Sequence, residues 1–332
     1  MFEEITINHT RIAPALFLAP MAGVTNSAFR RLLADFGGYG ALFTEMLSAS
    51  AFLNERPDES TYTKRRDCEG AVIYQFRTSG DENLEAVFEK MTSIPHTAID
   101  INLGCPAPEI QQQASGAALF RDFDRLKAVL TRIRRCYSGT LTVKVRLGDD
   151  AETWRQPFIE RLRLFEDSDI HAITVHPRLS TEKLKRRARW EEFPWIAAQT
   201  KLPIIGNGDV CSRKEVEANR TAFEPLAGLM LGRIVAVKPC IFRDFAGLPK
   251  LALDRAEIWD RMYRYTLEDL PPERAFGRLK EFSFYFAKNF VFGHEMFKGI
   301  QKARTAEQVR LEALRFLETQ PSLRADEGLA FT

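Results

Sequence analysis

A repeated alternation of short apolar runs and amphipathic stretches is the feature that most constrains the fold of this chain. Each run is rich in Val, Ile, Leu and Phe, ends at a polar or turn-forming residue, and precedes a segment with helical periodicity. The eight runs cover residues 16–20, 41–45, 71–75, 98–102, 141–146, 172–176, 203–207 and 228–231. Eight strand–helix units in about 250 residues, with strands buried on both faces, are typical of a barrel of parallel strands. The pattern therefore predicts an α/β fold, a (β/α)8 TIM barrel.

The chain after residue 248 has a different pattern. Between the strands, apolar residues three or four apart predict helices at 27–36, 83–91, 122–136 and 158–165. Beyond about Leu248 no further strand pattern follows. Residues 255–320 have the periodicity of several helices, with breaks at Leu270-Pro271-Pro272 and at Gly293. We therefore expect a barrel domain over 1–248 and a small C-terminal helical domain over 249–332.

Composition excludes several classes of protein. The first ten residues include Glu3, Glu4 and His9, so no secretory signal is expected, and no apolar stretch reaches the ~20 residues of a membrane span. The five cysteines lack the spacing of a disulfide or zinc framework, which indicates a reduced, cytoplasmic setting. They are Cys68, Cys105, Cys136, Cys211 and Cys240. The net charge of +2 attracts no polyanion overall, so nucleic-acid binding would need a local basic surface.

The predicted strand ends are polar. In a barrel of this type, the residues that do the chemistry lie at the C-terminal ends of the strands. Those ends are Pro20-Met21-Ala22-Gly23, Thr44-Glu45, Gln75, Asn102-Leu103-Gly104-Cys105-Pro106, Lys144-Val145-Arg146, His176-Pro177-Arg178, Asn207-Gly208-Asp209 and Gly232-Arg233. The sequence therefore predicts an active site at this end of the barrel.

Lys144 is the most informative of these residues taken alone. It lies between Val143 and Val145, so alternation along the strand turns its side chain into the barrel mouth. A buried ammonium group needs an anionic partner. That partner is either a bound anionic molecule or an internal carboxylate such as Asp100 or Glu45.

Five strand-end segments, taken in order, resemble the signature of the tRNA-dihydrouridine synthases. They are Leu18-Ala19-Pro20-Met21-Ala22-Gly23-Val24-Thr25, Asp100-Ile101-Asn102-Leu103-Gly104-Cys105-Pro106, Val143-Lys144-Val145-Arg146-Leu147-Gly148, Asn207-Gly208-Asp209 and Gly232-Arg233. The resemblance spans the barrel, extends more weakly into the tail, and implies a bacterial-type enzyme with bound FMN, transient NADPH and tRNA as substrate. Glu182 and Leu184 stand where the family has Gln and an aromatic residue, which leaves the subfamily and the RNA contacts open.

The resemblance implies reduction of the C5=C6 double bond of uridine. Hydride from flavin N5 to C6 leaves negative charge on C5 and O4, so C5 must then be protonated. The expected proton donor is Cys105 of the Asn-x-Gly-Cys-Pro loop, because an ordinary thiol is protonated near neutral pH. A lone cysteine is more often a small buried apolar residue, and the other four are interpreted in that way.

Flavin binding is expected of strand-end residues that offer amide, imidazole, ammonium or backbone donors. They are Pro20, Met21, Ala22, Gln75, Lys144, His176, Asn207, Gly208, Asp209, Gly232 and Arg233. The loops after strands seven and eight commonly hold phosphate through backbone N–H groups. Two such loops favour FMN, which has one terminal phosphate, over a dinucleotide. No Gly-x-Gly-x-x-Gly follows a strand, so a Rossmann-type NAD site is not expected. The amide side chains could instead cap backbone groups at the strand ends.

Substrate contacts are expected at the amide of the cysteine loop and at the cations that follow the sixth strand. They are Asn102, Arg178, Lys183, Lys185, Arg186 and Arg187. The last four belong to a basic run on a loop of the catalytic face, where they could bind RNA phosphates, and the helical domain over 249–332 is expected to add tRNA contacts. A solvated charged face is the plainer alternative. Neither a membrane nor an obligate protein partner is indicated.

Two other functions fit parts of the pattern. An FMN barrel reductase acting on a small pyrimidine, like the dihydroorotate dehydrogenases, would need the barrel but not the helical tail. A catalytically silent RNA-binding module would need neither flavin nor thiol, and it would be colourless.

Overall fold

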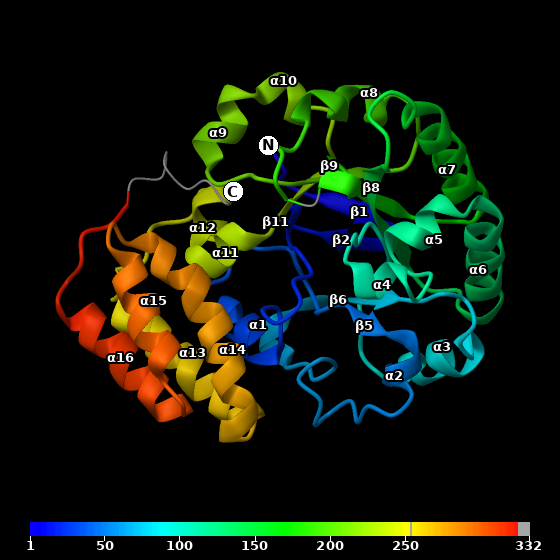
Figure 1. The fold of residues 1–332 in the computed structure, drawn as a ribbon. Coiled ribbons are helices and arrows are strands. Elements are labelled where there is room, and N and C mark those ends of the chain that lie inside the picture. Colours follow the sequence, from blue (N-terminus) through cyan, green and yellow to red (C-terminus); the bar gives the residue numbers. More distant parts are fainter. Residues whose placement is uncertain (183, 253, 325–332) are drawn as a thin grey trace.

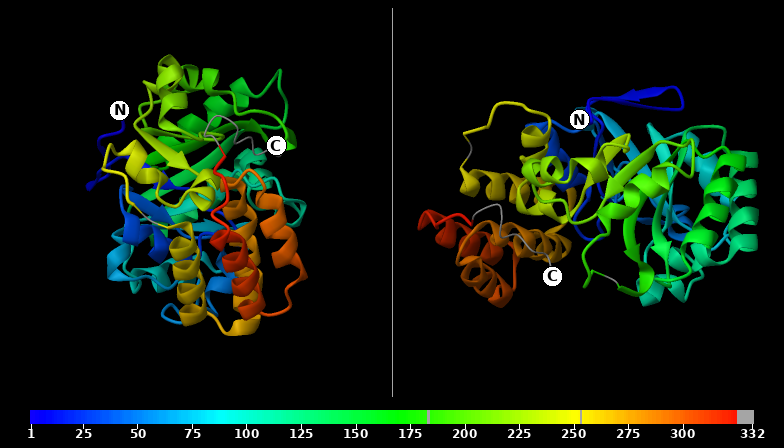
Figure 2. Two further views of the ribbon diagram at one scale, coloured as in Figure 1. Left: turned by 90° about the vertical axis from the view of Figure 1, so that its left-hand side faces the viewer. Right: turned by 90° about the horizontal axis from the view of Figure 1, so that it is seen from above.

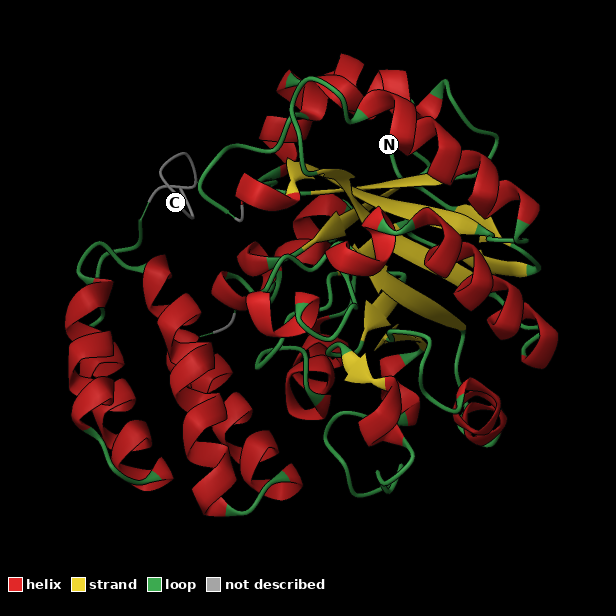
Figure 3. Cartoon of the chain, turned by 45° about the vertical axis from the view of Figure 1, so that its right-hand side comes forward, coloured by secondary structure: helices red, strands yellow, loops and turns green. Residues whose placement is uncertain are grey.

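A closed barrel of eight parallel strands forms the centre of the molecule (Figures 1 and 3). The computed structural model describes residues 1–182, 184–252 and 254–324. The barrel strands are β3 (Leu16–Leu18), β4 (Ala41–Phe43), β6 (Ala71–Arg77), β7 (Ala98–Leu103), β8 (Leu141–Gly148), β9 (Ala172–Leu179), β10 (Ile204–Asn207) and β11 (Gly228–Leu231). Pairing of β4 with β6, and of β11 with β3, closes the ring. The predicted (β/α)8 barrel is confirmed, with a strand in each of the eight predicted runs.

Helices surround the barrel. They are α1 (Ser27–Phe36), α2 (Ala49–Phe52), α3 (Leu84–Thr92), α4 (Pro108–Gln111), α5 (Ala117–Arg121), α6 (Phe123–Cys136), α7 (Arg155–Asp167), α8 (Phe193–Ala197), α9 (Arg213–Ala218), α10 (Arg220–Phe223), α11 (Arg233–Val237) and α12 (Ile241–Phe245). Helices α1, α3 and α6 begin within one residue of their predicted starts, whereas α7 begins three residues before the predicted residue 158 and, within the described residues, has no side-chain cap. Asn26 accepts from the N–H of Phe29 at the start of α1, and Asp122 accepts from Arg125 at the start of α6.

The barrel interior near the N-terminal ends of the strands is filled by apolar side chains. Inward residues such as Phe17, Phe43, Ile73 and Met230 form a buried cluster with the N-terminal hairpin, β1 (Ile5–Ile7) and β2 (Thr10–Ile12). This hairpin was not predicted, because each of its strands has only three residues. It covers the N-terminal end of the barrel, opposite the polar ends of the strands. The short strand β5 (Leu47–Ser48) extends the sheet beside β6.

A cluster of longer helices follows the barrel and packs beside α1 (Figure 2). They are α13 (Arg255–Asp269), α14 (Pro272–Phe286), α15 (Gly293–Lys302) and α16 (Ala306–Glu318). The breaks fall where Leu270-Pro271-Pro272 and Gly293 predict them. The rings of Phe29 on α1 and Phe282 on α14 have centroids 6.0 Å apart, and the apolar core runs without interruption from the barrel into these helices.

An ionic junction also ties the helices to the barrel. The buried carboxylate of Asp269, at the end of α13, accepts hydrogen bonds from Ser27 and from the side chains of Lys64 and Arg66. These two cations are therefore internal partners of Asp269. Within the described residues, no helix has the length and apolarity needed to span a membrane.

Candidate active site

Polar side chains from neighbouring strands meet inside the C-terminal end of the barrel. The strand register places Gln75 beside Asp100, Asp100 beside Thr142, and Asn102 beside Lys144. Alternation along each strand turns these residues inward above the apolar layer. The sequence-predicted residues Gln75, Asn102 and Lys144 are thus brought together. Asp100 and Thr142, which were not predicted as site residues, lie among them.

A series of side-chain hydrogen bonds connects the interior of the barrel to the loop that carries Cys105. The Asp100 carboxylate accepts from Thr142 Oγ1 at 2.6 Å and from Gln75 Nε2 at 2.8 Å. Gln75 Oε1 accepts from Asn102 Nδ2 at 2.8 Å. Burial raises the pKa of Asp100 to about 6, although these hydrogen bonds and the charge of Lys144 oppose the shift.

The backbone around Cys105 is fixed by its neighbours. Asn102 Oδ1 accepts from the N–H of Cys105 at 3.0 Å and from that of Gly104 at 3.3 Å. A Cβ on Gly104 would lie 3.0 Å from the backbone of Val145, so a larger residue would press the loop away from β8. The Cys105 side chain remains half-buried at the mouth.

Gly116 supports the same loop from behind. Its φ of +63° favours glycine, and a Cβ there would lie 2.8 Å from the carbonyl oxygen of Cys105. We expect Gly116→Ala to lower the free energy of unfolding by about 1–3 kcal/mol and to displace the thiol. Gly37→Ala is the matched control, because Gly37 has a φ of +67° and nothing within 4 Å of its Cβ position. Thermal unfolding and the alkylation rate of Cys105 measure both effects; equal alkylation rates in the two variants would contradict the proposed support.

The Lys144 ammonium faces the mouth. Among the described residues it makes neither a hydrogen bond nor an ion pair, although Asp100 and Cys105 are near enough to act on it electrostatically. Burial, followed by the charge of Arg146, lowers the pKa of Lys144 to about 8. An anionic molecule bound in the mouth would reverse this shift. The structure thus favours the bound anion over an internal ion pair as the partner of Lys144.

His176 is held in one tautomer by Arg178. The Arg178 guanidinium donates to His176 Nε2 at 2.8 Å, and because a guanidinium cannot accept, the imidazole proton must be on Nδ1. Burial, together with Lys144 and three arginines, lowers the pKa of His176 well below its usual value, so the ring is neutral. The Nδ1–H group makes no hydrogen bond within the described residues. It is available to a molecule in the mouth.

Arg178 itself lies behind the site. It is 1% exposed, donates to Asp209 at 2.5 Å, and also donates to the carbonyl oxygen of Arg186. Asp209 accepts in addition from Arg233 at 3.0 Å. In this structure, Arg178 therefore contacts the loop and the histidine, and a role in positioning fits its burial better than direct contact with substrate.

The loops after β10 and β11 approach the mouth closely. Gly208, with a φ of +119°, lies so near His176 that a Cβ would be 2.9 Å from the imidazole ring. Its carbonyl oxygen accepts from Trp190 Nε1 at 2.8 Å. Asn207 Nδ2 donates to Met230 O at 2.9 Å and joins the two strands. Gly232 precedes α11, and a Cβ on it would lie 3.9 Å from the sulfur of Met21.

The loop from Pro20 to Gly23 is linked to the helical region. The N–H of Gly23 donates to Glu45 at 2.6 Å, and Arg278 of α14 donates to the same carboxylate oxygen at 3.4 Å. Arg278 also donates to the hydroxyl of Tyr62 at 3.0 Å. Burial raises the pKa of Glu45, with Arg278 opposing the shift. Met21 and Ala22 are not buried, so this loop borders the mouth.

A basic segment emerges beside the site. Lys185, Arg186 and Arg187 are exposed, and within the described residues their side chains make no hydrogen bond or ion pair. The backbone beneath them is anchored, since Arg186 O accepts from Arg178 and the N–H of Ala188 donates to Asp209 at 2.8 Å. Lys183, also predicted to contact substrate, lies outside the described residues. Glu182 folds inward, accepting from the N–H of Leu179 at 2.9 Å and pairing with Arg189.

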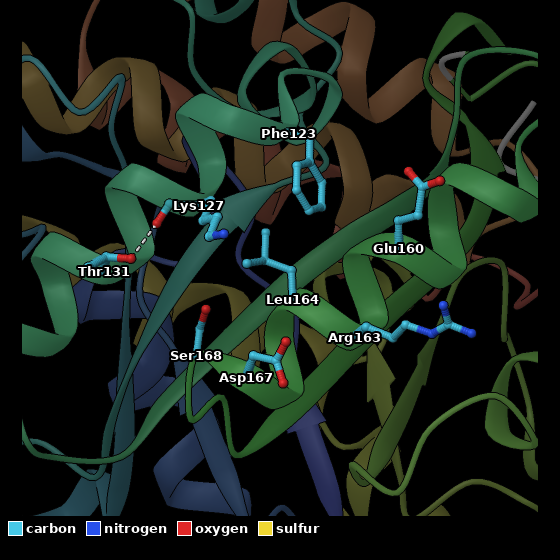
Figure 4. A pocket seen from close by; sticks show the side chains of 8 residues that line it. All are labelled: Phe123, Lys127, Thr131, Glu160, Arg163, Leu164, Asp167 and Ser168. Carbon is cyan, nitrogen blue, oxygen red and sulfur yellow. Dashed lines mark hydrogen bonds between the residues drawn. The ribbon is translucent and has the colours of Figure 1, made fainter.

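A hollow of about 280 Å³ lies elsewhere, on the outer surface between α6 and α7 (Figure 4). It contains none of the predicted site residues. Its lining is Phe123, Lys127, Thr131, Glu160, Arg163, Leu164, Asp167 and Ser168. Its charges are mixed and most of its side chains reach solvent, so it offers no alternative catalytic site.

The fold and the site together define a parallel β/α-barrel enzyme whose polar groups meet at the C-terminal ends of the strands. A family model described as dihydrouridine synthase (Dus) matches residues 17–318. The chain therefore belongs to the dihydrouridine synthase family.

Curated relatives agree with this assignment, and a solved structure shares the barrel fold. The chain is 31% identical over 238 residues to tRNA-dihydrouridine synthase B of Xanthomonas campestris, covering 71% of this chain and 70% of the relative. It is 28% identical over 238 residues to tRNA-dihydrouridine synthase B of Klebsiella pneumoniae, covering 72% and 73%. The old yellow enzyme homologue of Zymomonas mobilis shares the fold, with a TM-score of 0.53 and 13% identity over 78% of this chain and 95% of that one.

Proposed function

We propose that this protein reduces the C5=C6 bond of specific uridines in tRNA. The proposal is carried by two groups that lie at the same barrel mouth, the half-buried thiol of Cys105 and the ammonium of Lys144. Within the described residues, this ammonium makes no hydrogen bond or ion pair. The thiol suits proton donation to carbon, and the ammonium suits an electron-rich cofactor. Family membership supplies the substrate class, since the curated relatives are named for dihydrouridine synthesis in tRNA.

The residues at the mouth fit FMN. Lys144 and the Nδ1–H of His176 offer a cation and a donor to the electron-rich edge of the flavin ring. Gln75 is buried, with its amide bonded to Asp100 and Asn102, and would support the flavin site from within the barrel. Gly208 and Gly232 present backbone close to the mouth, as phosphate loops of such barrels do. We propose that these residues, with Pro20, Met21, Ala22, Asn207, Asp209 and Arg233, hold FMN, and that NADPH is its reductant.

The thiol then has a definite task. Bound flavin supplies the hydride that is added to C6 of the uracil. Cys105 donates the proton to C5, so that one hydride and one proton saturate the double bond. Asn102 holds the thiol loop through its oxygen, at 3.0 Å from the Cys105 nitrogen. The uracil must leave its stack to enter the mouth, at a cost of a few kcal/mol.

We propose that the basic segment and the helical region bind the RNA. Residues 1–248 would form the FMN-binding catalytic domain and residues 249–332 the tRNA-binding domain. Lys185, Arg186 and Arg187 project into solvent beside the mouth, where phosphates flanking an extruded base would pass. Arg278 and Glu45 hold α14 against the loop that borders the mouth.

Replacement of Lys185, Arg186 and Arg187 together by Gln should weaken tRNA binding and flatten its salt dependence. Each lost phosphate contact lowers the slope of log affinity against log salt by about 0.7–0.9, so the slope should fall by about 2–3. Filter binding or anisotropy over a range of salt concentrations measures it. The control replaces three cations of the outer surface, Lys127, Arg135 and Arg163. Equal slopes in the two triple variants would show that the segment does not contact phosphate.

Mapping of dihydrouridine by mass spectrometry tests the function in cells. We expect tRNA from cells that lack this gene to have lost dihydrouridine at one or more positions, and the wild-type gene to restore it. Unchanged tRNA, together with turnover of a small free pyrimidine by the purified protein, would support a dihydroorotate-dehydrogenase-like activity instead.

A further inference from the structure

The hydrogen-bond chain beneath the thiol has a fixed direction. Backbone N–H groups can only donate, so the atom of Asn102 that faces Gly104 and Cys105 must be its oxygen. Its NH2 group therefore faces Gln75, which must present its own oxygen in return. The NH2 group of Gln75 is then left for Asp100, whose carboxylate can only accept. The backbone N–H groups at one end and the Asp100 carboxylate at the other thus fix the same arrangement, in which each amide directs its NH2 group toward Asp100.

We propose that Asp100 is a positioning residue for Cys105. Its carboxylate terminates the chain Asp100–Gln75–Asn102 and thereby holds the Asn102 oxygen beneath the turn that carries the thiol. Asp100 and Gln75 are fully buried and Asn102 is 9% exposed, so solvent cannot replace a lost partner. The proposal deepens the function proposed above and rests on it for the role of the thiol. Its structural content does not depend on RNA reduction.

The fixed direction of the Asp100–Gln75–Asn102 hydrogen bonds predicts that one substitution can rescue another. In Asn102→Asp, one carboxylate oxygen still accepts from the backbone, but the other faces the oxygen of Gln75. Two acceptors in contact require a proton between them. Adding Asp100→Asn removes that need: Gln75 turns over, donates to the new carboxylate at position 102, and accepts from the new amide at position 100. That amide still accepts from Thr142, so every group is satisfied again.

The first readout is thermal stability against pH. In Asn102→Asp, the carboxyl at position 102 has a folded pKa raised above its unfolded value. Its stabilising contribution is therefore present at low pH and lost as pH rises through the folded pKa. We expect the Tm of this variant to fall between about pH 5 and 8 relative to wild type, on the order of several degrees. The double variant should recover at least half of that loss.

The second readout is the alkylation of Cys105 in the full-length protein as purified, followed by mass spectrometry. Exposed Cys68 in the same sample is the internal reference. We expect the Cys105 rate relative to Cys68 to rise several-fold in Asn102→Asp at neutral pH and to return toward wild type in the double variant. Asn207→Asp, with and without Asp100→Asn, is the matched control and should show no rescue, since Asn207 bonds to Met230.

A second pair covers the case in which Asn102→Asp does not fold. Gln75→Glu also sets two carboxyls in contact, and Asp100→Asn should rescue it, because the new carboxylate at position 75 can then accept from both neighbouring amides. Rescue in either pair supports the proposal. Simple additivity in both pairs, with unchanged relative alkylation of Cys105, would overturn it. Neither outcome depends on whether tRNA is the substrate, so a failure of the proposed function is recognised separately by dihydrouridine mapping.

Discussion

Cys105→Ala is expected to lower dihydrouridine formation by about 10²- to 10⁴-fold, the range for loss of a general acid. An alanine fits the half-buried position without strain, so the fold and the cofactor site should be unchanged. The variant should therefore be yellow and should still be bleached by NADPH. Only protonation at C5 is removed. Single-turnover conversion of a tRNA transcript by the reduced protein measures the effect.

The control for this experiment is Cys68→Ala, which removes the exposed thiol. It should retain wild-type activity. Wild-type conversion in Cys105→Ala would reject the thiol as proton donor. Loss of flavin from that variant would instead give Cys105 a structural role.

Lys144→Met is expected to weaken flavin binding by about 10- to 100-fold, which corresponds to loss of one charge-assisted hydrogen bond of about 1.5–3 kcal/mol. If the ammonium favours the reduced, more negative form by this amount, the reduction potential of bound flavin should fall by about 30–60 mV. Methionine keeps much of the length of the side chain and removes the charge. Equilibrium dialysis and a redox titration measure the two effects, with Lys127→Met on the outer surface as control.

The same ammonium predicts a pH dependence. The pKa of Lys144 is lowered to about 8 in the protein alone, and an anion bound beside it would raise this pKa. Flavin affinity should therefore be full below about pH 8 and decline as pH rises above it. Lys144→Met should lack this decline. An unchanged pH profile in the variant would assign the decline to another group.

The barrel could be predicted because each of its strands is marked by a short run of apolar residues that are contiguous in the sequence. Strands buried on both faces must be apolar, so the apolar runs predict the strands. Polar residues at the ends of these runs, such as Gln75 and Arg233, then predict the position of the active site, because such barrels carry it at the C-terminal ends of their strands. The starts of α1 and α6 were likewise predicted to within one residue from apolar periodicity. The N-terminal hairpin was not, because its short strands carry too brief a pattern.

Features that depend on the register between strands could not be predicted. Asp100 and Thr142 bond across β7 and β8, and only the register shows that they meet. Inward alternation along residues 98–102 and 141–146 was the one signal that could have identified both. Arg178 was expected to reach the substrate, but its partner Asp209 is 31 residues away, so nothing local indicated that it is held behind the site.

The contact between the helical region and the mouth also could not be predicted from the sequence. Arg278 and Glu45 are separated by 233 residues, and neither position has a local pattern that requires the other. The helices themselves were predictable, since Pro271, Pro272 and Gly293 interrupt an otherwise helical periodicity. Where they would pack was not.

The most direct test of the account is an anaerobic titration of the NADPH-reduced protein with unmodified tRNA transcript. Yellow absorbance should return, and one dihydrouridine should form for each flavin re-oxidised. Return of the colour with a free pyrimidine but not with tRNA, or a purified protein with no yellow colour, would contradict it.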